Sequence, residues 1–243
     1  MGEQTRQGIL LLFNSIWHSK AWPEEWREGT VSPLLKHGAG DRTDPSAYRP
    51  ITLTCALSKL FELVLHARLK RWAEEANLLV EEQAGFRSGR SSIEQIWTLQ
   101  EIVSVRREAK QPTYLAFLDV KSAYDRVWRA GLLHKLHSMG LHGKMLDILT
   151  SMLEKSVRRV AVQGSLSESF ITLIGLPQGA ILSPLLYAIY INGLAEELNR
   201  LDLGVLVFGR RVSVLLYADD IVLVADSAPD LQAMLNCAQG YAT

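Results

Sequence analysis

The spacing of apolar residues predicts that helices make up most of the first half of the chain. Between residues 56 and 76, apolar side chains recur every three or four positions, which is the spacing of one helix face. The same spacing predicts a helix over residues 3–19. A third helix should begin near Ser91, because Ser91 and Glu94 have the spacing of a capping box.

The pattern changes after Pro112, where short apolar runs replace the longer helical stripes. Residues 114–118 are a continuous apolar run that ends at Asp119, which is typical of a strand buried on both faces. Two further strand-like runs lie near the end of the chain, at 212–217 and 221–225. Helical segments and a hairpin separate these strands. This order predicts an α+β fold, with a mostly antiparallel sheet and helices on one face of it.

The composition is that of a folded protein, and it limits the partners and the cellular compartment that we expect. The chain has 243 residues, 48% of them hydrophobic and 21% charged, so it forms one large domain or two small ones. Lys and Arg total 26, and so do Asp and Glu, so any surface for nucleic acid must be local. Two cysteines cannot form a disulfide framework, which indicates a reducing compartment. No segment reaches the roughly 20 apolar residues that span a bilayer, and we expect no membrane partner.

Three aspartates stand beside the predicted strands. Asp119 ends one apolar run, and Asp219 and Asp220 lie in the turn between two others. Carboxylates beside buried strands are costly unless something compensates their charge. If these strands are neighbours, the carboxylates converge at one end of the sheet and raise each other's pKa, which a divalent cation would relieve. Oxygen ligands without Cys or His favour Mg²⁺ or Mn²⁺, and this points to phosphoryl transfer by two metal ions.

The pair Asp219 and Asp220 has a simpler alternative interpretation. Two aspartates in a hairpin turn are common without any metal, because Asp tolerates turn geometry. The apolar runs on both sides of the pair, and Asp119 at a second strand end, favour the metal site.

Five short motifs resemble those of reverse transcriptases, in the same order. Residues 117–125 (FLDVKSAYD) resemble the first catalytic motif of that family. Residues 175–186, which contain GLPQG and LSPLL, resemble the second, and residues 217–220 (YADD) resemble the third. Residues 48–51 (YRPI), with Lys59, and residues 85–91 (GFRSGRS) are similar to the finger motifs. The residues in these motifs resemble those of reverse transcriptases from non-LTR (LINE-like) retrotransposons.

This resemblance implies a polymerase of the right-hand type. Residues 1–112 would form an N-terminal helical segment and the fingers. Residues 113–243 would form the palm, with a ferredoxin-like antiparallel sheet. The implied activity is that of an RNA-directed DNA polymerase, which extends a DNA primer on an RNA template with dNTPs.

The resemblance also assigns the catalytic and metal-binding residues. Asp119, Asp219 and Asp220 would be catalytic. Asp119 and Asp219 would hold two Mg²⁺ or Mn²⁺ ions, with Asp220 assisting. The backbone carbonyl of Val120 would be a further ligand.

A second group of residues would contact the incoming nucleotide. They are Arg49, Lys59, Arg87, Tyr124, Gln178 and Gly179. Tyr124 would pack under the sugar and clash with a 2′-OH, although an ordinary core aromatic is an equally common interpretation. Gln178 would lie over the nucleotide and the template base. Arg49 and Lys59 would neutralise the charge of the triphosphate. Arg87 is equally compatible with a solvent-exposed loop, and Gly179 would let the backbone approach the ligand.

The chain departs from this family at its end, where only residues 221–243 follow Asp220. The family continues into a lysine-bearing motif and a helical thumb, and we expect neither here, nor an endonuclease. We interpret the chain as fingers and palm, from a truncated copy of an element. One alternative is an inactive remnant that at most binds nucleic acid. Another is an RNA-dependent RNA polymerase, which Tyr124 opposes because such an enzyme must admit the 2′-OH.

The sequence gives only indirect indications of where the protein is located in the cell. The absence of a targeting run predicts an intracellular protein. A nuclear site would follow from the resemblance alone. The sequence carries no indication of the oligomeric state.

Overall fold

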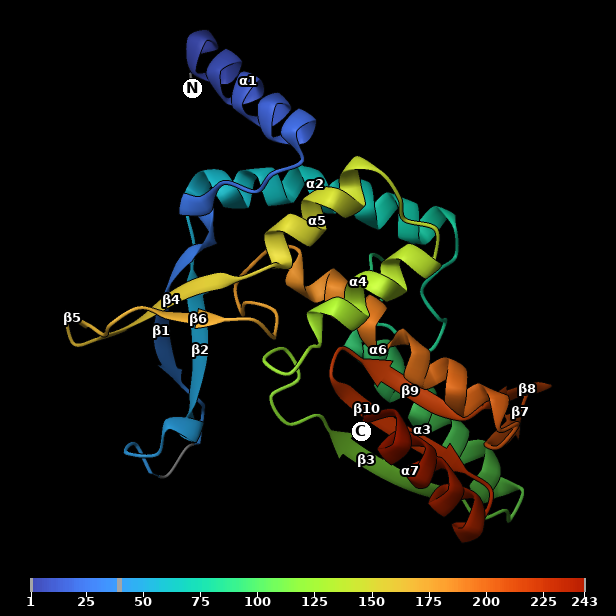
Figure 1. Cartoon of the computed structure of the whole chain (residues 1–243). Helices are drawn as coiled ribbons and strands as arrows, with labels where there is room; N and C mark the ends of the chain where they lie inside the picture. The colour runs from blue at the N-terminus through green and yellow to red at the C-terminus, as the bar shows by residue number, and fades with distance from the viewer. Residues whose placement is uncertain (1, 39–40, 243) are drawn as a thin grey trace. The chain divides into compact units, whose positions relative to one another are not determined.

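The computed structural model describes residues 2–38 and 41–242, and it has the mixed α+β content that the sequence predicts (Figure 1). The chain forms two compact units, each built from two segments. The first unit extends to Trp72 and resumes over Tyr124–Ser183. The second comprises Ala73–Ala123 and the chain from Pro184 onward. These borders differ from the predicted division near residue 112.

The first unit contains a five-stranded sheet in the order β2-β1-β4-β5, with β6 paired to β4. Strands β1 and β4 run parallel, and the other pairs are antiparallel. The elements of this unit are α1 (Glu3–Ser19), the short 3-10 helices η1 (Glu24–Arg27) and η2 (Pro45–Ala47), β1 (Glu28–Leu35), β2 (Tyr48–Leu53), α2 (Ala56–Glu75), α4 (Arg129–Ser138), α5 (Lys144–Leu153), β4 (Ser156–Val162), β5 (Ser165–Leu166) and β6 (Phe170–Thr172). The last turn of α2 belongs to the second unit.

Strand β2 has no counterpart in the apolar pattern of the sequence. Arg49 and Pro50 interrupt any alternation there, yet the segment pairs with β1, with Pro50 opposite Pro33. The proline is tolerated because β2 is an edge strand, where a missing N–H costs no ladder hydrogen bond.

Aromatic rings pack the N-terminal segment against α2. Phe61 of α2 is 2% exposed, and the centre of its ring lies 4.9 Å from that of Phe13. Trp22 and Trp26 contact the same ring, at 5.9 and 6.1 Å between centres. These tryptophans are therefore core residues of the first unit. The predicted helices over residues 3–19 and 56–76 are confirmed.

The second unit is built around a three-stranded antiparallel sheet in the order β3-β10-β9. Its elements are α3 (Ser92–Glu108), β3 (Tyr114–Asp119), α6 (Ser183–Arg200), β7 (Val205–Val207), β8 (Arg210–Val212), β9 (Val214–Tyr217), β10 (Asp220–Ala225) and α7 (Ala228–Ala242). Helix α3 begins with the predicted capping box, in which the Glu94 amide donates to Ser91 Oγ and the Ser91 amide donates to the Glu94 carboxylate. The predicted antiparallel sheet is confirmed.

Helices lie on both sides of this sheet, so the expectation of helices on one face only is wrong. Helix α7 packs against β3 and β10, and α3 packs against β9. Figure 1 shows α6 and α7 in front of the sheet and α3 behind it. The reason lies in α3, where buried Ile102 packs with Val205, Val207 and Val224 into a small apolar core.

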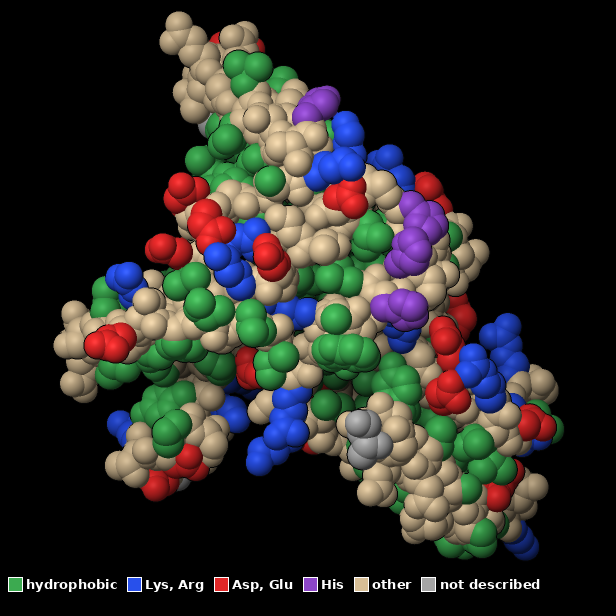
Figure 2. Space-filling view, viewed as in Figure 1, with side chains coloured by type: hydrophobic (Ala, Val, Ile, Leu, Met, Phe, Trp, Pro, Cys, Tyr) green, Lys and Arg blue, Asp and Glu red, His purple; other side chains and the backbone are tan. Residues whose placement is uncertain are grey.

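The surface carries both signs of charge. Figure 2 shows Lys and Arg side chains next to Asp and Glu side chains in small groups over the visible face. This agrees with a formal net charge of zero. None of the helices that the structure describes combines the length and the apolar character needed to cross a membrane.

Candidate active site

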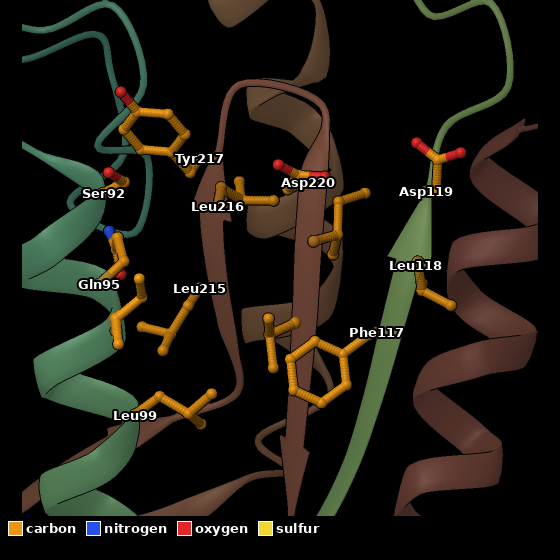
Figure 3. Close-up of a pocket in the computed structure, with 13 residues that line it drawn as sticks. Ser92, Gln95, Leu99, Phe117, Leu118, Asp119, Leu215, Leu216, Tyr217 and Asp220 are labelled. Carbon is orange, nitrogen blue, oxygen red and sulfur yellow. The ribbon is translucent and has the colours of Figure 1, made fainter. Parts of the chain in front are cut away.

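Two of the predicted catalytic aspartates face each other across neighbouring strands. Asp119 is the last residue of β3 and Asp220 the first of β10, and they are register partners in the antiparallel pair (Figure 3). Tyr217 of β9 is the partner of Asp220 on its other side. The expected convergence of carboxylates at one end of the sheet is therefore confirmed for Asp119 and Asp220.

The two paired carboxylates lie at the surface of the second unit. Asp119 and Asp220 are both exposed, because each lies at the end of its strand, where the sheet meets solvent. Asp219 is half-buried in the turn between β9 and β10. The two paired carboxylates are therefore accessible from solvent, whereas the Asp219 carboxylate is partly covered.

The turn that carries Asp219 is a two-residue hairpin loop, formed by Ala218 and Asp219 between the paired residues Tyr217 and Asp220. Ala218 has a φ of +59°, a backbone conformation that L-residues adopt rarely. The first residue of such loops is usually glycine when its φ is positive. The position of Asp219 therefore depends on an unfavourable conformation of the residue before it.

The oxygen atoms near the strand ends suit a hard cation better than zinc. Asp119, Asp220 and the carbonyl of Val120, which follows Asp119, offer oxygen ligands of the kind that Mg²⁺ and Mn²⁺ prefer. Within residues 2–38 and 41–242, no group of three His, Cys, Asp or Glu side chains is arranged to hold a metal ion.

An apolar pocket of about 370 Å³ lies beside Asp119 and Asp220, between α3 and the β3-β10-β9 sheet (Figure 3). Leu99 of α3 lines one side of it, and Phe117 and Leu215 of the sheet line the other. Asp119 and Asp220 lie at one end. The pocket is thus apolar along its length and acidic at one end.

In the first unit, Gln178 lies in a loop that follows β6 and is tied to β2. The backbone carbonyl of Gln178 accepts from the Thr52 amide at 2.7 Å. Gly179 has a φ of +104°, and a Cβ there would lie 2.9 Å from the Thr52 carbonyl oxygen. Gly179 thus permits a close approach to β2, and its approach to a ligand stays a prediction.

The half-buried Asp125 carboxylate holds the Gln178 side chain. Gln178 Nε2 donates to Asp125 Oδ2 at 3.3 Å. Burial raises the pKa of Asp125, against the opposing effects of Arg158 and of the hydrogen bond from Gln178. Burial lowers the pKa of Arg158, and Asp125 counteracts that shift. Asp125 and Arg158 therefore stabilise each other's charge next to Gln178.

Arg129 anchors the start of the loop that follows β6. The Arg129 guanidinium donates to the carbonyls of Gly175, Leu153 and Thr172, at 2.7, 3.0 and 3.1 Å, and to Ser156 Oγ at 3.2 Å. Burial, reinforced by Arg158, lowers its pKa to about 10, so it stays charged at neutral pH.

Glu62 of α2 holds the end of this loop. Its carboxylate accepts from the amides of Ile181 and Leu182, at 2.9 and 3.4 Å. Burial raises the pKa of Glu62 despite these bonds. No sequence pattern marks Glu62 or Arg129, because their partners are mostly backbone atoms of distant segments.

The other predicted nucleotide-binding residues have mixed surroundings. Arg49 is exposed on β2, and Lys59 is half-buried in the first turn of α2. Tyr124 is half-buried in a turn over residues 121–126, and its carbonyl accepts from the Leu176 amide at 2.7 Å. In the second unit, Arg87 is 10% exposed at its side chain and pairs with Glu74 at 2.8 Å. Arg87 is therefore not the solvent-exposed loop residue that the sequence allowed.

Comparison with known proteins gives a consistent result. The family model described as "Reverse transcriptase (RNA-dependent DNA polymerase)" matches residues 34–243. A probable RNA-directed DNA polymerase from transposon X-element of Drosophila melanogaster is 32% identical over 219 residues, which are 89% of this chain and 23% of that protein. The RNA-directed DNA polymerase from mobile element jockey of the same species is 29% identical over 95% of this chain and 25% of that protein. The chain thus spans about a quarter of the length of these relatives.

Solved structures agree on the fold. An apo telomerase from Candida tropicalis, truncated from its C-terminal domain, aligns with a TM-score of 0.59 and 16% identity. The alignment covers 95% of this chain and 51% of that one. A telomerase from the same species in complex with a fragment of telomeric RNA aligns with a TM-score of 0.62 and 13% identity, over 94% of this chain and 41% of that one. At these identities the likeness concerns the fold alone.

Proposed function

Because the chain belongs to the reverse transcriptase family and is related to the enzymes of non-LTR retrotransposons, we propose that it is an RNA-directed DNA polymerase domain of such an element. It extends a DNA primer on an RNA template with dNTPs. The observation that carries this proposal is the register pairing of Asp119 with Asp220 at the mouth of the hairpin that holds Asp219.

The acidic end of the β3-β10-β9 sheet is the proposed catalytic centre. Asp119 and Asp219 would hold two Mg²⁺ or Mn²⁺ ions, with Asp220 and the Val120 carbonyl as further oxygen ligands. When bound, the ions would activate the attacking primer 3′-OH and stabilise the charge that develops on the phosphate. The exposure of Asp119 and Asp220 supports this role, because a primer end and a triphosphate must both reach them.

The proposed assignment of fingers and palm follows the sequence motifs. Residues 1–112 are the N-terminal helical segment and the fingers, and residues 113–243 are the palm with its ferredoxin-like sheet. The antiparallel sheet of the second unit, with an acidic end, supports the palm assignment.

The proposed nucleotide contacts are residues of the first unit. Tyr124 excludes the 2′-OH, and Gln178 contacts the nucleotide and the template base. The hydrogen bond from Gln178 to Asp125 supports the second role, because it fixes the orientation of the carboxamide. Arg49 and Lys59 neutralise the triphosphate. Arg87, which is committed to Glu74, acts by ordering its own segment.

Primer extension on an RNA template tests the proposal. The chain is incubated with a DNA primer and with dNTPs or rNTPs, in Mg²⁺ and separately in Mn²⁺, and binding of the duplex is measured in parallel. Extension with dNTPs supports the proposal. Duplex binding without any extension would overturn it in favour of an inactive remnant, and extension with rNTPs as efficient as that with dNTPs would indicate an RNA polymerase.

A further inference from the structure

Gln83 is a completely buried glutamine that contacts the hairpin turn of the second unit. It lies between α2 and α3, and its side chain is 0% exposed. Gln83 Oε1 accepts from the Ala218 amide at 3.0 Å, and Gln83 Nε2 donates to the Ala218 carbonyl at 3.3 Å. One carboxamide thus binds both backbone polar groups of the residue that precedes Asp219.

The segment around Gln83 is itself fastened to the sheet. The Ala84 amide donates to the Leu216 carbonyl, and the Leu216 amide donates to the Glu82 carbonyl, both at 2.9 Å. Gln83 and Leu216 form a parallel bridge on the side of β9 that β10 does not occupy. The backbone around Gln83 therefore brings its side chain to the turn from a fixed position.

Two further features show that this contact is close and specific. Ala218 holds a φ of +59°, so its backbone needs outside support. Gly85 approaches the same residue so closely that a Cβ on it would lie 2.2 Å from the Ala218 nitrogen. Gln83 Oε1 also accepts from the Gly85 amide at 2.8 Å, which ties the glycine to the glutamine. The glutamine, the glycine and the strained alanine thus form one tightly packed unit.

We propose that Gln83 is a positioning residue for Asp219. Its carboxamide fixes the backbone of Ala218 in the left-handed conformation, and this sets the direction in which the Asp219 carboxylate leaves the turn. The inference rests on the proposed function only for the role of Asp219. Because Gln83 is completely buried, removing its carboxamide would leave the two Ala218 backbone groups without their hydrogen-bond partner.

The test replaces Gln83 by a side chain of similar length without hydrogen-bonding groups, in the variant Gln83→Met. The matched control is Val224→Ala, which removes buried volume from the apolar core of the same unit, away from the turn. Three quantities are measured on the full chain: amide hydrogen exchange by NMR, Mn²⁺ affinity by electron paramagnetic resonance, and kcat and KM in primer extension.

Gln83→Met should expose the Ala218 amide to exchange and weaken Mn²⁺ binding about 10-fold. It should also lower kcat by on the order of 10- to 100-fold, with KM for the dNTP changed less than about 3-fold, because a displaced ligand impairs the reacting geometry. Val224→Ala should lower the unfolding temperature and leave Mn²⁺ affinity and kcat unchanged. Equal effects of both variants on Mn²⁺ affinity would overturn the proposal, since Gln83 would then act through stability alone.

One measurement needs no variant and so remains decisive if Gln83→Met does not fold. In the parent chain the Ala218 amide should exchange on the order of 100-fold more slowly than an unprotected amide. An unprotected Ala218 amide would overturn the proposal. Because exchange and Mn²⁺ affinity need no polymerase activity, a parent chain that fails to extend primers would refute the proposed function without deciding the role of Gln83.

Discussion

Asp119 lies directly opposite Asp220 across the antiparallel pair of β3 and β10, and both carboxylates are exposed at the strand ends. Like charges in this relationship repel each other and destabilise the sheet that holds them. A bound cation would relieve this repulsion, as the proposed function requires at this end of the sheet.

This repulsion gives a prediction about stability without metal. In the presence of a chelator, Asp119→Asn should raise the free energy of unfolding by about 0.5 kcal/mol, and added salt should reduce the gain. Mg²⁺ should raise the unfolding temperature of the parent chain more than that of the variant, because only the parent keeps the full ligand set. Thermal unfolding monitored by circular dichroism measures both effects.

The control for this prediction is Asp202→Asn, which removes an exposed carboxylate of the same unit that pairs with Arg211. It should give no gain in stability. A lower unfolding temperature for Asp119→Asn in chelator would show that the two aspartates do not repel each other.

Glu62 should make the chain less stable as the pH rises. Because burial raises its pKa in the folded state, the folded chain binds this proton more tightly than the unfolded chain does. The contribution of Glu62 to stability is therefore largest below its ordinary pKa of 4.5 and declines as the pH rises through the raised value. Glu62→Gln should remove this decline, which urea unfolding at a series of pH values measures.

A second variant separates the charge of Glu62 from its hydrogen bonds. Glu62→Ala leaves the Ile181 and Leu182 amides without their acceptor and should cost about 1–2 kcal/mol at every pH. Identical pH profiles for the parent chain and Glu62→Gln would contradict the account.

Asp125 and Gln178 should act as a coupled pair in nucleotide incorporation. Asp125→Ala and Gln178→Ala should each lower kcat/KM by about 10-fold, because the first change frees the carboxamide from its fixed orientation and the second removes it. The double variant should lose less than the two single losses combined, with a coupling of about 1 kcal/mol. Losses that simply add would show that the hydrogen bond does not orient Gln178.

Tyr124 should set the choice between dNTPs and rNTPs. Tyr124→Ala should lower the preference for dNTPs by at least about 10-fold, because removing the ring makes room for a 2′-OH. Tyr124→Phe keeps the ring and should keep the preference. Competition between dNTP and rNTP in single-nucleotide extension gives the ratio directly, and an unchanged ratio in Tyr124→Ala would place the selectivity elsewhere.

Much of the fold could be predicted from the sequence because its strands and helices carry strong local patterns. The apolar run before Asp119 predicted β3, and the spacing of Ser91 and Glu94 predicted the start of α3. Carboxylates at two strand ends predicted that they would converge if the strands are neighbours, and the structure pairs Asp119 with Asp220. The placement of helices on one face failed, because the pattern of α3 does not reveal which side of the sheet it covers.

The supporting residues of the site could not be predicted for a different reason. Gln83, Glu62 and Arg129 bind backbone atoms that lie 135, 119 and 46 positions away in the sequence. A backbone carbonyl or amide has the same chemistry at every residue, so no side-chain pattern marks these partners. Only the folded chain reveals why these three polar groups are buried.

The most direct test of the central claim is single-nucleotide incorporation into a DNA primer on an RNA template, with Mg²⁺ and one dNTP. Asp119→Asn and Asp219→Asn are compared with the parent chain and with the control Asp202→Asn. The parent and the control should both incorporate the nucleotide, and the other two variants should lose about 1,000-fold or more of this activity. Incorporation by Asp219→Asn at the rate of the parent would contradict the claim that these aspartates catalyse DNA synthesis.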